Sequence, residues 1–407
     1  MTFRAAAGLC AALLVGSVHL ASAQDLASTQ VSQAVAPPIA KTVPYFFEEF
    51  GGRRADPYDW LRKKKGDPEV VRHLEAENAY AAARLAPIGK LIEQLEAEGA
   101  GRADSSDEGP DYVENGYLYQ RRIAEGARFP VITRRRTPAD RPQVVLDVES
   151  LAAGHSQYDL NEYAVSPDGN LVAFAVDFTG GRLHQIFIRD ITTGQVRATG
   201  IADVASDLEF SADSKQLFYI RAEADTLRSY QLWRHAIGTV PSADRLIYQE
   251  ADPTFDLTLK KSKSGRFILL TSAQQQSTEI RYLPADRPDD PLVVIEPRRR
   301  DIAYFADHVG DQFYFRTNLD APDFRVVAAP EAAPQVANWT TVVASIPGQH
   351  IGRLEVFDSF IAIGIDLDAT RLVRVFRRAD LSEIPVPLPA GINVVEMPFD
   401  DLSNGEP

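Results

Sequence analysis

The stretch EYAVSPDGNLVAFAVDFTGGRLHQIFIRDITTGQVR, which runs from Glu162 to Arg197, contains a complete four-strand unit. Its two longest apolar runs, Leu171 to Asp177 and His184 to Asp190, are rich in Val, Ile and Phe and are bounded by Gly or Pro, which is typical of strands. Shorter strands are expected on either side, at 162–166 and 195–198. Four antiparallel strands within about forty residues predict one blade of a β-propeller.

Turns of similar chemistry recur along the chain at a nearly constant interval. Gly accepts a positive φ, and Asp, Asn and Ser side chains hydrogen-bond to the backbone of a turn. The turns are separated by 53, 45, 51, 46 and 48 residues and lie at Asn115-Gly116, Asp168-Gly169, Asp213-Ser214, Ser264-Gly265, Gly310-Asp311 and Asp358-Ser359. Apolar runs follow them at 117–123, 171–176, 216–220, 267–271, 312–315 and 360–365. Such a period is typical of propeller blades.

These repeats predict an all-β protein of the seven-bladed β-propeller type. Six full blades fit between Asp111 and about Pro389, and residues 392–397 open a seventh before the sequence stops at Pro407. A blade needs three or four strands to bury its faces against its neighbours, so we expect the seventh blade to be incomplete.

The first 110 residues have a different pattern. Arg4, an apolar run and the small residues Ala21-Ser22-Ala23 predict a signal peptide over 1–23, cleaved after Ala23. A flexible arm is expected over 24–43, an N-terminal helical segment over 44–110, and the propeller, truncated in its last blade, over 111–407. Within the helical segment, Asp67 is an N-cap candidate followed by Pro at the first helical position. Helices are predicted over 68–85 and 88–98, separated at Pro87.

Charge and cysteine content limit the classes of function. The 407 residues carry a net charge of -14, and an acidic surface repels phosphate backbones, which argues against nucleic-acid binding. Cys10, the only cysteine, lies in the signal, so the mature chain is expected to have no disulfide and no thiolate metal site. No later segment approaches the roughly eighteen apolar residues of a membrane span. We predict a periplasmic or secreted protein without a cofactor and without membrane attachment after signal cleavage.

The sequence offers no catalytic or metal-binding constellation. It lacks the Gly-x-Ser-x-Gly elbow of α/β-hydrolases, and its Ser residues lie mostly in turns. The histidines of the mature chain are scattered singly, without the paired spacing of metal ligands, which favours surface or packing roles. They are His73, His155, His184, His235, His308 and His350. No catalytic or metal-binding residue is therefore assigned.

Three basic runs and one acidic pair have two interpretations each. The runs 63–65, 134–136 and 298–300 suit acidic partners, or they are solvated loops and edge strands in which charge discourages edge pairing. Asp366 and Asp368 lack the following Gly and Glu of a calcium loop, so we interpret them as a hairpin tip.

Arg182 is the single candidate for a peptide contact. It follows Gly180-Gly181 in the connection between two strong strands, where a propeller presents polar groups to a ligand. The alternative is a solvated turn arginine. Glu223 and Asp225 also lie between strands, but no partner for them can be identified from the sequence.

Several segments resemble the prolyl oligopeptidase family of serine peptidases. DPYDWLR at 56–62 and PEVVRHLEAENAY at 68–80 look like the opening of that family. QLWRHAIGT at 231–239 and DRLIYQEAD at 244–252 are similar to its oligopeptidase B branch in particular. The segments 145–180 and 313–318 also resemble this family. The likeness runs from about Pro44 to the end and is strong in the third blade.

The resemblance implies a function that the spacing argument does not give. In the family, a seven-bladed propeller lies over an α/β-hydrolase domain with a Ser, Asp, His triad and restricts entry to short peptides, and oligopeptidase B cuts after Arg and Lys. The N-terminal helices pack on that hydrolase domain, which has roughly 250 residues and is absent from this sequence. The triad is therefore carried over to no position, whereas Arg182 matches a basic position that lies towards the interior of the family's second blade.

Three hypotheses follow from this resemblance. In the first hypothesis the chain is the propeller portion of an oligopeptidase B-like endopeptidase that acts on short peptides, basic ones among them, after Arg or Lys, and it is inactive alone. In the second hypothesis it is a stand-alone periplasmic propeller that binds peptides or a protein partner. In the third, a separate polypeptide supplies the hydrolase domain.

Overall fold

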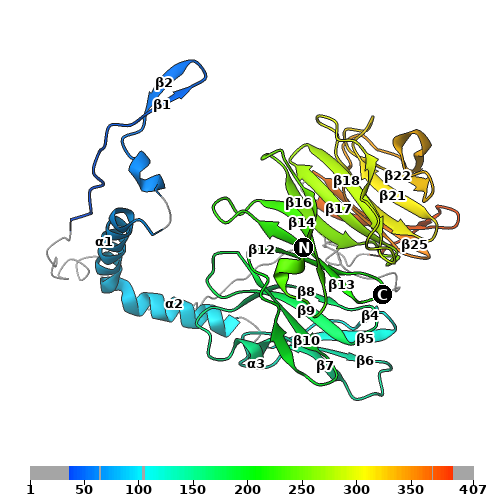
Figure 1. Cartoon of the computed structure of the whole chain (residues 1–407), viewed down its shortest axis with the longest axis horizontal. Helices are drawn as coiled ribbons and strands as arrows, with labels where there is room; N and C mark the ends of the chain where they lie inside the picture. Colours follow the sequence, from blue (N-terminus) through cyan, green and yellow to red (C-terminus); the bar gives the residue numbers. More distant parts are fainter. Residues whose placement is uncertain (1–35, 64–65, 103–105, 369, 388–407) are drawn as a thin grey trace, which may run out of the picture. The chain divides into compact units, whose positions relative to one another are not determined.

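The computed structural model describes residues 36–63, 66–102, 106–368 and 370–387 (Figure 1). The chain divides into two compact units, residues 1–104 and 105–407. The predicted signal peptide, most of the predicted arm and the predicted start of a seventh blade lie outside the described residues. Within the described residues, no helix has the length and apolar character needed to cross a membrane.

The first unit contains a two-stranded hairpin and two α-helices joined by a short 3-10 helix. Asp67 caps the first α-helix by accepting hydrogen bonds from the amides of Glu69 and Val70, at 2.9 and 3.4 Å. The helix then ends at Leu85 as predicted, because Pro87 cannot continue it. The elements are β1 (Phe46–Glu49), β2 (Gly52–Ala55), η1 (Asp59–Arg62), α1 (Pro68–Leu85), η2 (Ala86–Ile88) and α2 (Gly89–Arg102).

No described residue of α1 or α2 is buried. The large apolar side chains that remain uncovered, each about half exposed, are Leu74, Leu85, Ile88, Leu91 and Leu95. An uncovered apolar surface of this kind usually marks an interaction site.

The second unit consists, in its described residues, of six antiparallel sheets, which we call blades 1 to 6 in chain order. In each of blades 2 to 6 the four strands pair in the order in which they occur in the sequence. Blade 1 has β3 (Asp107–Glu108), β4 (Tyr112–Glu114), β5 (Tyr117–Ile123), β6 (Val131–Arg135) and β7 (Gln143–Asp147), followed by α3 (Val148–Ala152). Blade 2 has β8 (Asp159–Val165), β9 (Leu171–Asp177), β10 (Gln185–Asp190) and β11 (Val196–Ala198). Blade 3 has β12 (Val204–Phe210), β13 (Gln216–Ala222), β14 (Ser229–Ala236) and β15 (Arg245–Gln249).

The remaining blades repeat the same order. Blade 4 has β16 (Asp256–Lys261), β17 (Phe267–Gln274), β18 (Ser277–Pro284) and β19 (Val293–Glu296). Blade 5 has β20 (Tyr304–Val309), β21 (Gln312–Thr317), β22 (Arg325–Pro330) and β23 (Thr340–Val343). Blade 6 has β24 (His350–Val356), β25 (Phe360–Leu367), β26 (Thr370–Arg377) and β27 (Glu383–Ile384). The all-β, blade-repeat prediction is confirmed. The predicted turns join β4 to β5 in blade 1 and the first strand to the second in blades 2 to 6.

The predicted turns have the backbone conformations that their residues favour. Asn115 and Gly116 both have positive φ, of 47° and 75°, as a tight two-residue hairpin requires. Gly169 has a φ of 73°, and its carbonyl accepts a hydrogen bond of 2.6 Å from the buried Arg134 of blade 1. The turn between β8 and β9 is therefore also a point of attachment between two blades.

The core lies between consecutive blades rather than in one central cluster. Tyr119 and Leu146 of blade 1 pack with Val172 and Phe174 of blade 2. Four further clusters of buried apolar residues bridge blades 2 and 3, 3 and 4, 4 and 5, and 5 and 6. Each blade thus buries its apolar faces against its neighbours.

Candidate functional site

Antiparallel pairing places one set of connections at the same end of every blade. Strands alternate in direction, so the connection from the second to the third strand lies at the same end as the connection from the fourth strand to the next blade. We call this the loop end. It contains Arg182 between β9 and β10, Arg228 between β13 and β14, and Glu250 between β15 and β16.

Arg182 is held at the loop end by a buried carboxylate. Asp177 at the end of β9 accepts hydrogen bonds from the Thr179 amide at 2.7 Å, the Thr179 hydroxyl at 2.8 Å and the Arg182 amide at 2.6 Å. Burial alone raises the pKa of Asp177, but these hydrogen bonds outweigh it and lower the pKa below its usual range. The fixed carboxylate closes a turn in which Arg182 has a φ of 59°.

The Arg182 side chain is exposed at this turn. Its guanidinium makes no hydrogen bond or ion pair with the part of the chain that the structure describes. The solvent-facing guanidinium offers five N–H donors from a backbone position that Asp177 fixes, and such donors suit carboxylates and backbone carbonyls of a peptide.

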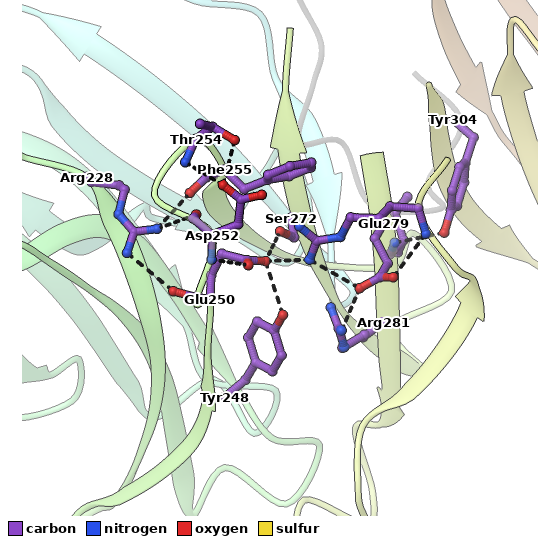
Figure 2. A network of polar contacts seen from close by, with 12 residues as sticks. Arg228, Tyr248, Glu250, Asp252, Thr254, Phe255, Ser272, Glu279, Arg281 and Tyr304 are labelled. Atoms are coloured by element: carbon purple, nitrogen blue, oxygen red, sulfur yellow. Dashed lines mark hydrogen bonds and ion pairs between the residues drawn. The ribbon is translucent and has the colours of Figure 1, made fainter. Parts of the chain in front are cut away.

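The densest polar network at the loop end is centred on Glu250, whose side chain is only 3% exposed (Figure 2). Its carboxylate accepts hydrogen bonds from Arg298 at 2.6 Å, from Tyr248 at 3.1 Å, from the Asp252 amide at 3.0 Å and from the Ser272 hydroxyl. Burial alone raises the pKa of Glu250, but the bonds from Arg298, Ser272 and the Asp252 amide lower it to about 2. Glu250 is therefore a fixed anion at neutral pH.

Arg298 extends this network from blade 3 to blade 4. Its guanidinium lies 3.4 Å from the Glu279 carboxylate and 4.1 Å from the centre of the Phe255 ring. Glu279 also accepts the Arg298 amide, at 3.0 Å, and pairs with Arg281 at 2.5 Å. The ring contact and the two carboxylates hold the arginine in one orientation.

Arg228 is a second arginine in this network. Its guanidinium donates to the carbonyls of Asp252 at 2.8 Å and Phe255 at 3.2 Å and pairs with Glu223 at 3.1 Å. Glu223, for which no partner could be identified from the sequence, thus fixes the arginine that ties the β13–β14 connection to the β15–β16 connection.

The structure corrects the solvated-loop interpretation of two basic runs. Arg134 is 4% exposed and anchors the Gly169 turn, while Arg298 is about three-quarters buried in the Glu250 network. Arg299 and Arg300 pair locally with Glu296 and Asp301 and fit the original interpretation. No pattern within the runs signals the two buried cases, because their partners lie in other blades.

Other sequence predictions fall where expected. The tip containing Asp368, with a φ of 51°, joins β25 to β26 in a hairpin. His184, His235 and His308 are buried among neighbouring blades or strands, in agreement with a packing role. No contact links Arg182 to the Glu250 network among the described residues, so the two form separate features of the same end.

The buried carboxylates of this end are occupied by structural contacts. The carboxylates of Glu250 and Glu279 are already occupied by arginines, hydroxyls and amides, which leaves them poorly suited to proton transfer. Arg182 retains its full set of guanidinium donors.

Comparison with known proteins places this architecture in a family. The sequence model described as "Prolyl oligopeptidase, N-terminal beta-propeller domain" matches residues 37–401. Dipeptidyl aminopeptidase BI of Pseudoxanthomonas mexicana is 33% identical over 88% of this chain and 53% of its own length. Protease 2 of Moraxella lacunata is 29% identical over 72% of this chain and 43% of its own length. The chain thus spans about half the length of these curated relatives.

Solved structures show the same fold. Oligopeptidase B from Leishmania major has a TM-score of 0.78 at 23% identity. The match spans 87% of this chain and 54% of the Leishmania chain. Oligopeptidase B from Trypanosoma brucei, solved in a closed form with covalently bound antipain, has a TM-score of 0.75 at 26% identity, with the same coverage. Together with the match over residues 37–401, these likenesses show that the chain belongs to the prolyl oligopeptidase family and contains its N-terminal β-propeller domain.

Proposed function

We propose that this chain is the substrate-gating propeller portion of an oligopeptidase B-like serine endopeptidase that acts on short peptides after Arg or Lys. The observation that carries the proposal is the family match over residues 37–401, to which six consecutive blades of the structure correspond. Such a propeller acts on a substrate by admitting or excluding it, so the relevant property is which peptides reach and bind the loop end. The uncovered apolar residues of α1 and α2 give a surface on which a hydrolase domain docks.

Arg182 is the residue we assign to peptide contact. Its backbone is fixed by Asp177, and its exposed guanidinium is free to donate to peptide carbonyls or to a terminal carboxylate. Replacing it with Ala should weaken binding of a short peptide at least about tenfold, because a hydrogen bond that involves a charged group contributes about 1.5–3 kcal/mol. Arg197→Ala is the matched control, because Arg197 is an exposed arginine on the outer strand of the same blade.

The test uses the purified 407-residue chain and an amidated, arginine-containing peptide without acidic groups. We expect binding by fluorescence anisotropy that depends on Arg182 and not on Arg197. We expect no hydrolysis of an arginine dipeptide amide, since the 407 residues contain no Gly-x-Ser-x-Gly. Hydrolysis that a serine-directed inhibitor blocks, or binding that is indifferent to Arg182→Ala, overturns the proposal.

Two further hypotheses differ in measurable ways. A stand-alone propeller that binds peptides or a protein partner requires a monomeric chain with one cooperative thermal transition, so a broad or absent transition counts against it. A dipeptidyl aminopeptidase role is favoured by the 33% identical relative of that name. It predicts that peptides with a free amino terminus bind more tightly than their acetylated forms.

The cellular location is also a proposal. The predicted signal over 1–23 directs the chain to a periplasm or to the exterior, and cleavage leaves Gln24 as the first residue. Amino-terminal sequencing of the exported protein tests this directly. An intact Met1 in the mature protein contradicts it.

A further inference from the structure

A surface pocket of about 500 Å³ lies between the outer strand of blade 3 and the β18–β19 connection of blade 4. Arg234, Arg245 and Arg281 contribute to its walls, together with Leu246 and Leu292. Three arginines around one pocket stand out in a chain whose net charge is -14. We propose that this pocket binds a carboxylate-bearing peptide segment in extended conformation.

The geometry of β15 places the pocket along a strand edge. Four consecutive residues of this strand, Arg245 to Tyr248, line the pocket, although side chains of a regular strand alternate between its two faces. The pocket therefore follows the edge of the strand and not one face of the sheet. In the described residues β15 pairs only with β14, on its other side. An edge of this kind accepts an added strand through main-chain hydrogen bonds.

The register of β15 is irregular at this point. Pairing with β14 shifts between Leu232↔Tyr248 and Trp233↔Leu246, so Ile247 forms a bulge. A bulge changes the direction of the side chains around it and increases the local twist of the strand. The bulge thus allows Leu246, which is 45% exposed, and Ile247 to face the same pocket.

The pocket has a net positive charge after the ion pairs of its acidic residues are taken into account, and this charge favours an anion. Asp289 is paired with Arg234 at 2.5 Å, and Asp290 with Arg287 at 3.0 Å, so both carboxylates are neutralised. Arg245 is exposed and has no ion-pair partner in the described chain. It is the residue that leaves the pocket with an excess positive charge.

Arg281, whose charge is balanced by Glu279, forms another wall of the pocket. Its guanidinium lies 4.2 Å from the centre of the Tyr248 ring and pairs with Glu279, while its Nη1 atom has no hydrogen-bond partner in the described structure (Figure 2). The stacking fixes the plane of the guanidinium at the pocket wall. The apolar side chains of Leu246 and Leu292 then suit the aliphatic part of a Glu side chain or of the neighbouring peptide residue.

This inference is independent of the proposed gating function. Arg245 is on the first half of the outer strand of blade 3, whereas Arg182 lies at the loop end of blade 2. Arg182→Ala should therefore leave binding at this pocket unchanged, and failure of one proposal does not imply failure of the other.

The experiment measures binding of short unlabelled peptides to the purified chain by isothermal titration calorimetry. One peptide has a central Glu and an amidated C-terminus, the second has Gln in its place, and the third has the Gln and a free C-terminal carboxylate. We expect the Glu or the free-carboxylate peptide to bind and the neutral peptide to bind about tenfold more weakly, with the difference reduced by salt. Whichever carboxylate peptide binds identifies the kind of carboxylate recognised.

Variants locate the site. Arg245→Gln should weaken binding of the preferred peptide about tenfold, and Arg245→Lys, which keeps the charge, should weaken it less. Arg197→Gln is the matched control, because Arg197 is exposed on the outer strand of blade 2. Since both arginines are exposed, their variants should unfold at the wild-type temperature. Equal binding of the neutral peptide, or equal losses in Arg245→Gln and Arg197→Gln, overturns the proposal.

Discussion

Replacing Glu250 with Gln tests how strongly the buried network joins blades 3 and 4. The pKa of Glu250 is lowered from 4.5 to about 2, and each unit corresponds to about 1.4 kcal/mol of stabilisation. The full shift gives about 3 kcal/mol. Arg298 is 27% exposed, so solvent screening reduces this contribution, and we expect Glu250→Gln to lower the free energy of unfolding by about 2–3 kcal/mol at pH 7.

The same shift fixes the sign of the pH dependence. A carboxyl whose pKa is lower in the folded state than in the unfolded state contributes its full stabilisation above about pH 4.5 and loses it as the pH falls towards about 2. The difference between wild type and Glu250→Gln should thus be constant from about pH 7 to about pH 5. Below about pH 4.5 it should shrink by at most about 1.4 kcal/mol for each pH unit.

Urea unfolding followed by tryptophan fluorescence at pH 7, 5, 4 and 3.5 measures both effects. Trp233 of blade 3 and Trp339 of blade 5 report on the propeller. Glu125→Gln is the control, because Glu125 is exposed in the β5–β6 connection and has no described partner. A loss below about 0.5 kcal/mol at pH 7, the range of ordinary surface substitutions, refutes the reasoning. So does a difference that stays the same between pH 5 and pH 3.5.

Two further predictions concern turns and caps. Gly169→Ala places a Cβ 3.1 Å from Arg134 Nη1 at a φ of 73°, whereas Gly180→Ala at a φ of 72° meets no atom within 4 Å. We expect losses of about 2–3 and about 1 kcal/mol respectively in urea unfolding, and equal losses contradict the role of Arg134. Asp67→Ala removes the N-cap of α1, so amides at the start of the helix should exchange with deuterium about fivefold faster, consistent with about 1 kcal/mol. If exchange at the start of α1 is no faster in Asp67→Ala than in the mid-helix control Glu75→Ala, the capping role of Asp67 is contradicted.

The order of the strands was predictable because it depends on local chemistry. A strand begins after Asp168-Gly169 since Gly169 has the positive φ that a tight turn needs, and the apolar run from Leu171 then follows. The first helix was predictable for the same reason, from Asp67 and Pro68 at its start. The beginning of the propeller was less so, because β3 at Asp107–Glu108 is short and polar and forms only by pairing with β5.

The Glu250 network was not predictable from any single segment. Its main partners, Ser272 and Arg298, lie 22 and 48 residues further along the chain, in or beside the next blade. A buried carboxylate of this kind looks in the sequence like any other loop Glu. Only the packing of one blade on the next removes it from water and brings the arginine to it.

The repeat itself nevertheless contains a signal for such contacts. Among the described strands, the first strand of blade 4 pairs on one side only, so its amides on the other side need acceptors. Alternate amides of β16, those of Leu259 and Lys261, are bound by Asp207 and Glu209 of β12 at 2.7 and 2.6 Å. Both pairs are 52 residues apart, within the spread of the intervals between the predicted turns.

A similar separation holds at other junctions between blades. The Lys263 amide donates to Asp307, 44 residues away, and Ser214 accepts from the Asp168 amide, 46 residues away. Neighbouring blades therefore bind each other through acidic and hydroxyl side chains that accept hydrogen bonds from backbone amides about one blade length away in the sequence. Because neighbouring blades supply acceptors for each other's amides, removing one blade leaves unpaired amides on its neighbour as well as an uncovered apolar face. The propeller is thus stabilised from blade to blade, and the Glu250–Arg298 pair is one such junction.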